Sequence, residues 1–575
     1  MHSSQRFLVD YDMAMLRAVA ENRDVELTTN RQTEAADQLA VALLEPLSVR
    51  VALARLSSKG REALDAILAR GGRMRAPQFS RSFGQVRAIG PGRLEREAPW
   101  RDPASPAEEL LYLGFMFRAF YQDEGGPGEF VFVPDDLLPM LPGPQHGPSV
   151  FSVETIGVPR HEGRRDGDGG ALVFDLFAYL AYVQNHDVHP YADGRLGRRD
   201  LGSLQGRLTD PDTRRLAFLR HLAERLGFLA LHDRTLRLEA AQVRQWLTQP
   251  LSSQVATLQR AWLDDSSWND LCRVPSLQCD PQTDWHQRHN PVAPRFALLA
   301  LLARCPRDAW WLAASFVASV KEAHPDFQRP DGDYTSWYIR DVDTGAYLSG
   351  FEAWEQVEGA YVADLLVGVL KWLGVVESAG TGVLESGDLV CRLTEAGLRL
   401  LDLLPDGPES PPPLSVSVGA DFRVTVPEPV NLYTRFQLER FAVIESTNPC
   451  GYRLTAGSIM EALSRGIQIE QVLAFLQQAS EGPLPANVVG QLRLWAGRFG
   501  QVALEEVALL TVKEERVLKE LSVLPETRSL IDTMLSPTVA LVLKRDLPRL
   551  HRELRALGYL APLPADSMDD RAKRG

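Results

Sequence analysis

The sequence predicts a mostly helical α+β protein that is built from several modules. Its 575 residues are enough for about three to four domains. Apolar residues recur at helical spacing along most of the chain, and short runs of β-type residues lie beside Gly-rich turns. The proline-rich stretch 405–413 has the composition of a linker and separates the last quarter of the chain from the rest.

The N-terminal part predicts a group of helices followed by a hairpin. Residues 1–45 carry two short helical patterns that need later residues to pack against. Residues 46–142 then predict three helices and a hairpin. The helices lie around Leu64, around Phe79 and over the GPGRLERE sequence, and the hairpin turns at Gly125–Gly128. Three helices followed by a hairpin are the plan of a winged helix, whose third helix can enter the major groove of DNA.

Two further stretches repeat this order. Residues 171–250 again place helical patterns before a wing-like sequence, FLALHDRTLRLE, and predict a second winged-helix-like unit. Residues 251–404 are helical and rich in tryptophan, and their last part has the form of a helix, a hairpin and a closing helix, which predicts a third such unit. Because residues 321–364 carry three basic and ten acidic residues, we expect the tryptophans to form a core rather than a surface on which bases stack.

Positive charge is concentrated in two stretches, although the net charge of the chain is −13. A negative field repels phosphate at long range, which argues against a general polyanion-binding protein. Residues 70–101 nevertheless carry eight arginines and two glutamates, and residues 195–225 carry eight arginines and four acids. Both stretches coincide with winged-helix-like patterns, so we expect DNA contact there, with an ordinary solvated surface as the alternative. The arginines expected at the DNA are Arg73, Arg75, Arg81, Arg87, Arg93, Arg96, Arg198, Arg199, Arg214 and Arg215.

The last module, residues 414–564, predicts mixed α and β structure. The alternation of apolar and polar residues from Val416 to Val426 predicts one strand with a buried face. Four helical patterns follow, and the apolar run of Thr538–Leu543 then predicts a buried strand before a last helix. Residues 565–575 form a charged tail that we expect to be disordered.

A series of short sequences in this module resembles a known family. The series is DFRVTVP, LERFA, YRLTAGSIMEAL, the residues Gly466 and Glu470, PLPANV, LRLWAGRFG, LSPTVALVL and LRALGYLAP. It resembles the N-terminal domain of XPB-type helicases, which also occurs in bacterial helicase-associated proteins, and it covers roughly a quarter of the chain. The resemblance implies a domain that accompanies or regulates DNA-unwinding machinery, by contacting DNA or by gating the access of the motor to it.

The sequence carries no motif of a motor or of a common hydrolase. A helicase motor needs a phosphate-binding GxxxxGK[ST] loop and an acidic strand end that holds magnesium, and neither is present. No GxSxG nucleophile elbow occurs, and adjacent carboxylates such as Glu505 and Glu506 do not face each other on a helix. We therefore expect a non-catalytic protein. A hydrolase with an unrecognised site is an alternative for which the sequence offers no set of reacting groups.

The cysteines and histidines predict neither a metal site nor a disulfide framework. Cys272 and Cys279 with His286 and His289 are spaced too widely for a usual zinc knuckle. The five cysteines are scattered and odd in number, so we expect reduced thiols in a cytoplasmic protein without metal or cofactor. The longest apolar helix pattern, Tyr361–Val376, falls short of the roughly 20 residues of a membrane span, and no basic and apolar leader opens the sequence.

These observations lead to two hypotheses for the function. The first is a non-catalytic DNA-binding or helicase-associated accessory protein of DNA processing or repair. Its basic N-terminal half would meet duplex or junction DNA, and its C-terminal module would engage DNA, a helicase or a nuclease. The second is a protein–protein adaptor whose acidic middle region docks a basic partner without DNA contact. Salt-dependent DNA binding by the purified protein would separate the two.

Overall fold

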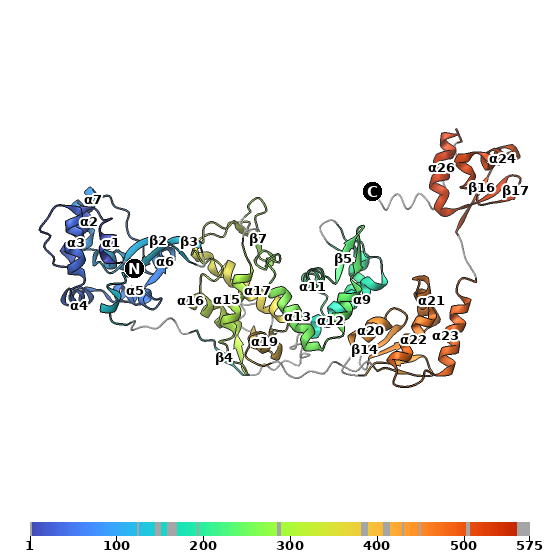
Figure 1. The fold of residues 1–575 in the computed structure, drawn as a ribbon. Helices are drawn as coiled ribbons and strands as arrows, with labels where there is room; N and C mark the ends of the chain where they lie inside the picture. The colour runs from blue at the N-terminus through green and yellow to red at the C-terminus, as the bar shows by residue number, and fades with distance from the viewer. Residues whose placement is uncertain are drawn as a thin grey trace. The chain divides into compact units, whose positions relative to one another are not determined.

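The computed structural model divides into two compact units, whose elements are drawn in Figure 1. The first unit comprises Met1–Pro413 and Pro429–Phe436, and the second comprises Leu414–Glu428 and Gln437–Gly575. Most of the expected linker and the whole expected tail lie outside the described residues. The structure describes residues 3–123, 126–143, 151–157, 170–191, 195–284, 289–380, 389–405, 415–427, 431–447, 450–501 and 506–559.

Helices dominate both units, and the named sheets are small, with two to four antiparallel strands each. The mostly helical α+β class that the sequence predicts is thereby confirmed. Within the described part of the chain, the helices are too short or too polar to cross a membrane.

The first unit begins with helices that pack on a hairpin. These helices are α1 (Ser4–Leu8), α2 (Met13–Asn22), α3 (Gln32–Leu43) and α4 (Pro46–Arg55). The carboxylate of Asp12 caps α2 by accepting a hydrogen bond from the backbone N–H of Met15. Buried side chains of α1, α2 and α3 form one cluster with Phe117 and Phe132 of the hairpin. Short helices such as these gain most of their stability from packing of this kind.

The first module then follows the order helix, strand, helix, helix, strand, strand. Its elements are α5 (Ser58–Leu68), β1 (Arg73–Arg75), α6 (Ala76–Phe83), α8 (Pro106–Tyr112), β2 (Phe117–Asp123) and β3 (Gly126–Phe132), with the short helices η1 (Pro99–Arg101) and η2 (Leu138–Met140). The strands lie in the order β1-β3-β2. Ser105 caps α8, whose residue Leu110 is fully buried in the core of the module.

The GPGRLERE sequence forms α7 (Pro91–Glu97), but this helix is not the third helix of the module. It lies in the connection between α6 and α8 and packs beside α2 through Leu94. The expected helix is therefore present, but the helix that directly precedes the hairpin is α8, which was not expected from the sequence. Leu94 is the buried residue of α7, and a helix with so narrow an apolar stripe covers a surface instead of forming a core.

The second module consists of three helices and a hairpin. Its elements are α9 (Gly170–Asn185), α10 (Arg198–Gln205), α11 (Thr213–Arg225), β5 (Leu229–His232) and β6 (Thr235–Leu238). The chain that follows α9 joins the hairpin, because the N–H of Leu236 donates to the carbonyl of Val188 at 2.9 Å. On α11, the ring of Phe218 contacts Trp268 and Trp372 of the next module, so the two modules share one core.

The third module repeats the order of the first. Its elements are α15 (Val292–Leu302), β8 (Trp310–Leu312), α16 (Ala313–Ala323), the π-helix η5 (Glu355–Gly359) continued by α17 (Ala360–Val367) and α18 (Val369–Trp372), β10 (Val376–Ala379) and β11 (Val390–Leu393). Strands β8, β11 and β10 are neighbours in that order, as β1, β3 and β2 are in the first module.

Further elements surround this repeat. They are β4 (Thr155–Ile156), α12 (Ala240–Leu247), α13 (Leu251–Leu263), η3 (Leu271–Arg273), β7 (Leu277–Cys279), β9 (Ile339–Asp341), η4 (Phe351–Ala353) and α19 (Glu395–Leu400). Among the described residues of 251–404, the buried tryptophans are Trp262, Trp268, Trp310, Trp311, Trp354 and Trp372. The expectation that the tryptophans of this region form a core is confirmed for these six.

The second unit begins with a four-stranded sheet in the order β12-β13-β15-β14. Its elements are β12 (Ser417–Val418), β13 (Arg423–Thr425), α20 (Leu432–Leu438), β14 (Val443–Thr447), β15 (Cys450–Arg453), α21 (Ala456–Ser464), α22 (Ile469–Ala479) and α23 (Ala486–Arg498). Helix α20 starts in the first unit, where Leu432 and Phe436 belong to the large core. All four expected helical patterns therefore form helices.

The expected single strand from Val416 to Val426 is instead a hairpin of β12 and β13. The chain turns between Gly419 and Phe422, and Ser417 lies opposite Thr425. Polar and apolar residues alternate on both sides of this turn, so the period of the sequence does not reveal it.

The remaining described residues form a three-stranded sheet in the order β16-β18-β17 with helices on it. Its elements are β16 (Val507–Thr511), α24 (Glu515–Val523), α25 (Pro525–Arg528), β17 (Thr533–Ser536), β18 (Val539–Leu543), η7 (Lys544–Asp546) and α26 (Leu547–Ala556). Leu521, Val542 and Leu550 form the centre of its core. The expected strand at Thr538–Leu543 and the expected last helix are both present.

Candidate nucleic-acid interface

Arg75 and Arg81, two of the arginines expected at DNA, have partners inside the first unit. Arg75 is 7% exposed, and its guanidinium lies over the ring of Phe130. Arg81 donates to both carboxylate oxygens of Asp326 at 2.8 Å and lies over the ring of Phe351. Because Asp326 belongs to the acidic third module, Arg81 joins two modules instead of facing solvent.

Arg87 and Arg93 pair with glutamates of the first module. Arg87 Nη2 lies 2.6 Å from the carboxylate of Glu108, whose side chain is fully buried on α8. Burial raises the pKa of Glu108, but hydrogen bonds from Arg87 and from the backbone outweigh burial and hold this pKa below its usual range. Arg93 forms an ion pair of 2.7 Å with Glu97, one turn later on α7. Arg87 therefore satisfies a buried carboxylate, whereas Arg93 is exposed but already paired.

Arg214 and Arg215 lie at the start of α11, the third helix of the second module. Arg214 Nη2 is 2.6 Å from Asp364 of the third module. The side chain of Arg215 is 5% exposed and lies 2.8 Å from Asp175 and 3.4 Å from Asp210. A phosphate cannot reach Arg215 while this contact is intact. Arg214 is partly exposed, but its guanidinium is already paired with a carboxylate.

Four of the ten expected residues remain exposed and make no ion pair with another described residue. They are Arg73, Arg96, Arg198 and Arg199. Arg73 and Arg96 lie on different elements, β1 and α7. Arg198 and Arg199 are adjacent at the start of α10. DNA contact stays a prediction for these four arginines, and α10 is where two of them lie together.

Helix α10 presents a basic face that a phosphate backbone can approach closely. Arg195 and Arg207, which are outside the expected set, are exposed near its two ends. The other exposed residues of this face are small, namely Gly202, Ser203 and Gly206. Small residues let a second backbone come near. The fully buried Leu204 attaches the opposite side of α10 to the core.

Several carboxylates of the acidic third module form ion pairs with arginines inside the protein. Asp326 and Asp364 neutralise arginines of the first and second modules, as described above. Glu358 of the π-helix η5 lies 2.6 Å from Arg329, and both side chains are buried. Burial raises the pKa of Glu358 to about 7 despite the neighbouring guanidinium. The charge of this region along the sequence therefore overstates the acidity of its surface.

Cys272 and Cys279 form a disulfide with Cα atoms 5.5 Å apart. The expectation that all cysteines are thiols is wrong for this pair, because η3 and β7 bring the two residues together, and disulfide sulfurs are not thiolate ligands. Burial, followed by nearby arginines, lowers the pKa of His289 to about 4, and His286 lies outside the described residues. No cluster of three or more His, Cys, Asp and Glu side chains suited to a metal ion occurs in the part of the chain that the structure describes.

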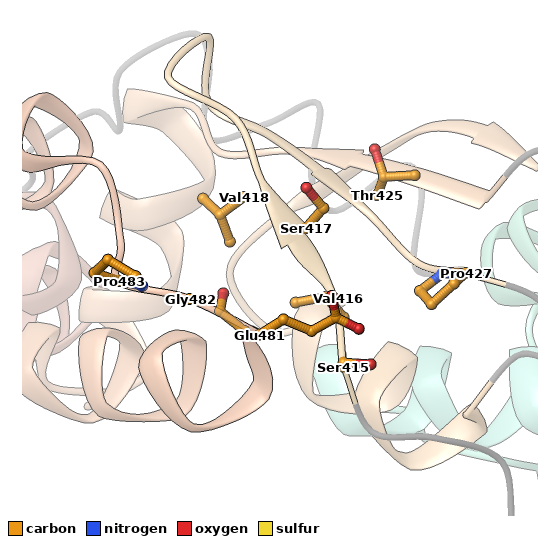
Figure 2. Close-up of a pocket in the computed structure, with 10 residues that line it drawn as sticks. Ser415, Val416, Ser417, Val418, Thr425, Pro427, Glu481, Gly482 and Pro483 are labelled. Atoms are coloured by element: carbon orange, nitrogen blue, oxygen red, sulfur yellow. The ribbon is translucent and has the colours of Figure 1, made fainter.

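An open cleft of about 350 Å³ lies in the second unit beside β12 (Figure 2). Its lining consists of Ser415, Val416, Ser417, Val418, Thr425, Pro427, Ser480, Glu481, Gly482 and Pro483. The N–H of Val416 donates to the carbonyl of Ala479 at 2.7 Å, which attaches the strand to the end of α22. These lining residues offer hydroxyl groups and one carboxylate but no cation for a phosphate. The cleft is therefore not part of the candidate interface.

Comparison with known proteins adds information on the second unit. Residues 416–533 match a family model described as helicase conserved C-terminal domain. No curated protein matches the chain. The match includes the four-stranded sheet and the helices after it, and it stops where β17 begins. It agrees with the expected helicase association, while the likeness to XPB-type helicases in particular stays a resemblance. The second unit of this protein thus contains a helicase-associated domain.

Proposed function

We propose that this protein is a non-catalytic accessory of a helicase or nuclease and that it binds duplex DNA through its first unit. The helicase-associated domain of the second unit supports the proposal that this protein acts together with a DNA-unwinding motor. The first and third modules share one order of helices and strands and one strand pairing. We interpret this order as that of a winged helix, a fold that is common among DNA-binding proteins. The sequence lacks a phosphate loop, so the chain supplies binding and the partner supplies the motor.

The observation that carries the DNA contact is the basic face of α10. Arg198 and Arg199 are exposed and make no ion pair with a described residue, so each can neutralise a phosphate and release counterions. The arginines that are paired with carboxylates inside the protein would have to break these ion pairs before they could bind a phosphate. We therefore place the main phosphate contact at α10 and not at α7 or α11.

Charge reversal on α10 tests this proposal. The double variant Arg198→Glu, Arg199→Glu removes two cations and adds two anions at the proposed contact. Its affinity for a duplex of about 20 base pairs should fall by one to two orders of magnitude or more, because each good protein–DNA contact contributes about 1–3 kcal/mol. The slope of log affinity against log salt should become shallower by roughly 0.9 for each phosphate contact. Both side chains are exposed, so the melting temperature should change little.

The matched control is Arg93→Glu, Arg96→Glu on α7, which changes the charge by the same amount. We expect a much smaller loss of affinity, because Arg93 is already paired with Glu97. Unchanged DNA affinity in a folded variant of α10 would contradict the proposed contact. Equal losses in both double variants would mean that net charge alone decides binding.

A protein-adaptor function is the second candidate, and the last sheet of the second unit favours it. Strands β16 and β17 expose Val507, Leu509, Met534 and Leu535, each between 44% and 63% exposed. Val507 and Leu509 alternate along the edge strand β16 and therefore share one face of the sheet, and exposed apolar residues that lie together can mark interaction sites in soluble proteins. Absence of DNA binding by the parent protein at low salt would make this function the leading one.

A further inference from the structure

The strands β7 and β9 form a small sheet whose outer face carries large exposed side chains. Gln278 of β7 lies opposite Arg340 of β9, and Tyr347 lies opposite Arg340 on its other side. Tyr338 and Val342 are each two residues from Arg340, so the alternation of a strand places them on the same face. Tyr338, Val342 and Tyr347 are between 49% and 52% exposed. We call the group of Tyr338, Arg340, Val342 and Tyr347 the tyrosine face.

The inner side of this sheet attaches it to the protein. The side chains of Leu277, Ile339 and Leu348 are buried in the large core of the first unit. The disulfide between Cys272 and Cys279 joins β7 to η3. The backbone under the tyrosine face is therefore held in place, which lowers the entropic cost of ordering its side chains on binding.

Contacts within the tyrosine face hold its side chains before any partner binds. The guanidinium of Arg340 lies over the ring of Tyr347, 4.2 Å from its centroid. The ring of Tyr338 meets Tyr347 edge on, with centroids 6.2 Å apart. The hydroxyl of Tyr347 donates to the carboxylate of Asp280 at 2.9 Å, and Arg340 Nη2 lies 3.4 Å from the same oxygen. Asp280 thus fixes both side chains and neutralises the charge of Arg340.

The composition of the tyrosine face is typical of a protein interface. Tyrosine and arginine are among the residues that contribute most to binding energy at such interfaces. A tyrosine ring offers a large contact area and has few rotatable bonds to immobilise. Single exposed apolar residues are common on soluble proteins, whereas here two tyrosines and a valine lie together on one rigid face.

The charge around the tyrosine face indicates the kind of partner. Residues 276–284 and 338–348 contain four aspartates and, as the one basic residue, Arg340. Asp343 follows Val342 directly and is exposed. Nucleic acid stacks on aromatic rings only where positive charge surrounds them. A cationic protein segment, by contrast, is attracted both by the aspartates and by the tyrosine rings.

We propose that the tyrosine face is a docking surface for a segment of a partner protein that carries arginine or lysine side chains. A cation of the partner lies over an exposed tyrosine ring, whose quadrupole attracts it. Asp343 forms an ion pair with a second cation at the rim. The proposal goes beyond the DNA contact, because the tyrosine face shares no residue with α10 and gives the accessory protein a surface for a protein partner.

A fluorescently labelled peptide of alternating arginine and serine tests the proposal by anisotropy at about 0.15 M salt. The parent should bind this peptide, and Tyr338→Ser should weaken binding roughly five- to thirty-fold, as expected for truncating a central aromatic residue of an interface. Asp343→Asn should weaken it by about fivefold at most, because this ion pair is exposed. A peptide with uncharged citrulline in place of arginine should bind more weakly to the parent. Both substituted residues are exposed, so the melting temperatures should stay parental.

Two control variants separate the tyrosine face from a general attraction between a basic peptide and an acidic protein. Tyr191→Ser removes a tyrosine that is 60% exposed in the second module and should leave the peptide affinity within about twofold of the parent. Arg198→Glu, Arg199→Glu makes the chain more negative without changing the tyrosine face, so it should also bind the peptide as the parent does. Tighter binding by this variant would mean that net charge decides binding and would overturn the proposal.

Three further results would also overturn it. They are absence of peptide binding by the parent, equal affinities of Tyr338→Ser and the parent, and an equal loss in Tyr191→Ser. Tighter binding of single-stranded oligothymidine than of the peptide, lost in Tyr338→Ser, would assign the face to nucleic acid instead. Tyr338→Ser should keep the parental affinity for duplex DNA, so failure of the docking surface and failure of the α10 contact are distinguished by separate measurements.

Discussion

Replacing Arg215 by methionine should destabilise the first unit, since this arginine neutralises a buried carboxylate. The side chains of Arg215 and Asp175 are 5% and 1% exposed, and their nitrogen and oxygen atoms lie 2.8 Å apart. Removing one partner of such a pair leaves an uncompensated buried carboxylate, which costs about 3–5 kcal/mol. Methionine fills much of the same volume, so only a small packing loss adds to this cost.

The destabilisation of the Arg215→Met variant should grow as the pH rises. Burial raises the pKa of Asp175, although Arg215 and the backbone N–H of Thr209 lower it in part. Without Arg215 the pKa in the folded state rises further above its unfolded value. The proton that the folded variant then holds stabilises it at low pH and is lost as the pH rises through the raised pKa. The stability difference from the parent should thus be smaller near about pH 5 than near about pH 8.

Urea denaturation followed by tryptophan fluorescence measures this effect. Trp268 and Trp372 contact Phe218 on α11, one turn from Arg215, so their emission reports on the affected core. The double variant Arg215→Met, Asp175→Leu removes both charges and should recover most of the lost stability. A single Arg215→Met variant with parental stability, within about 0.5 kcal/mol, and reduced DNA affinity would refute the reasoning, because Arg215 would then face phosphate.

Two further predictions concern energy use and pH. The purified protein should neither hydrolyse ATP nor unwind duplex, because the sequence contains no phosphate loop, and DNA-stimulated turnover in a clean preparation would contradict the non-catalytic proposal. Burial raises the pKa of Glu358 from 4.5 to about 7, so the folded protein holds a proton between these values that the unfolded chain releases. The free energy of unfolding of the parent should therefore fall relative to that of Glu358→Gln as the pH rises through this window, by about 3 kcal/mol at most. Urea denaturation midpoints of both proteins, measured across the pH range, would show this difference.

The sequence determined most of the helices and several strands, because hydrophobic period is a local property. The strand at Thr538–Leu543 and the final helix follow directly from their apolar spacing. The period could not show that Val416 to Val426 folds back on itself, since both arms of the hairpin alternate in the same way. The hydrophobic period also could not show that α7 is a surface helix. This depends on the residues against which its one leucine, Leu94, packs in the folded chain.

For the same reason, the sequence reveals only part of the candidate site. Arginine-rich stretches are visible in the sequence, and two of their residues, Arg198 and Arg199, lie exposed and adjacent in the structure.

The tertiary structure alone decided which arginines are available to a ligand. Arg81 meets a carboxylate 245 residues away, and Arg214 meets one 150 residues away. Local charge counts place these arginines in basic stretches and their partners in an acidic one. The fold brings the two together because burying the modules against each other desolvates both charges, and a desolvated charge needs a partner of opposite sign.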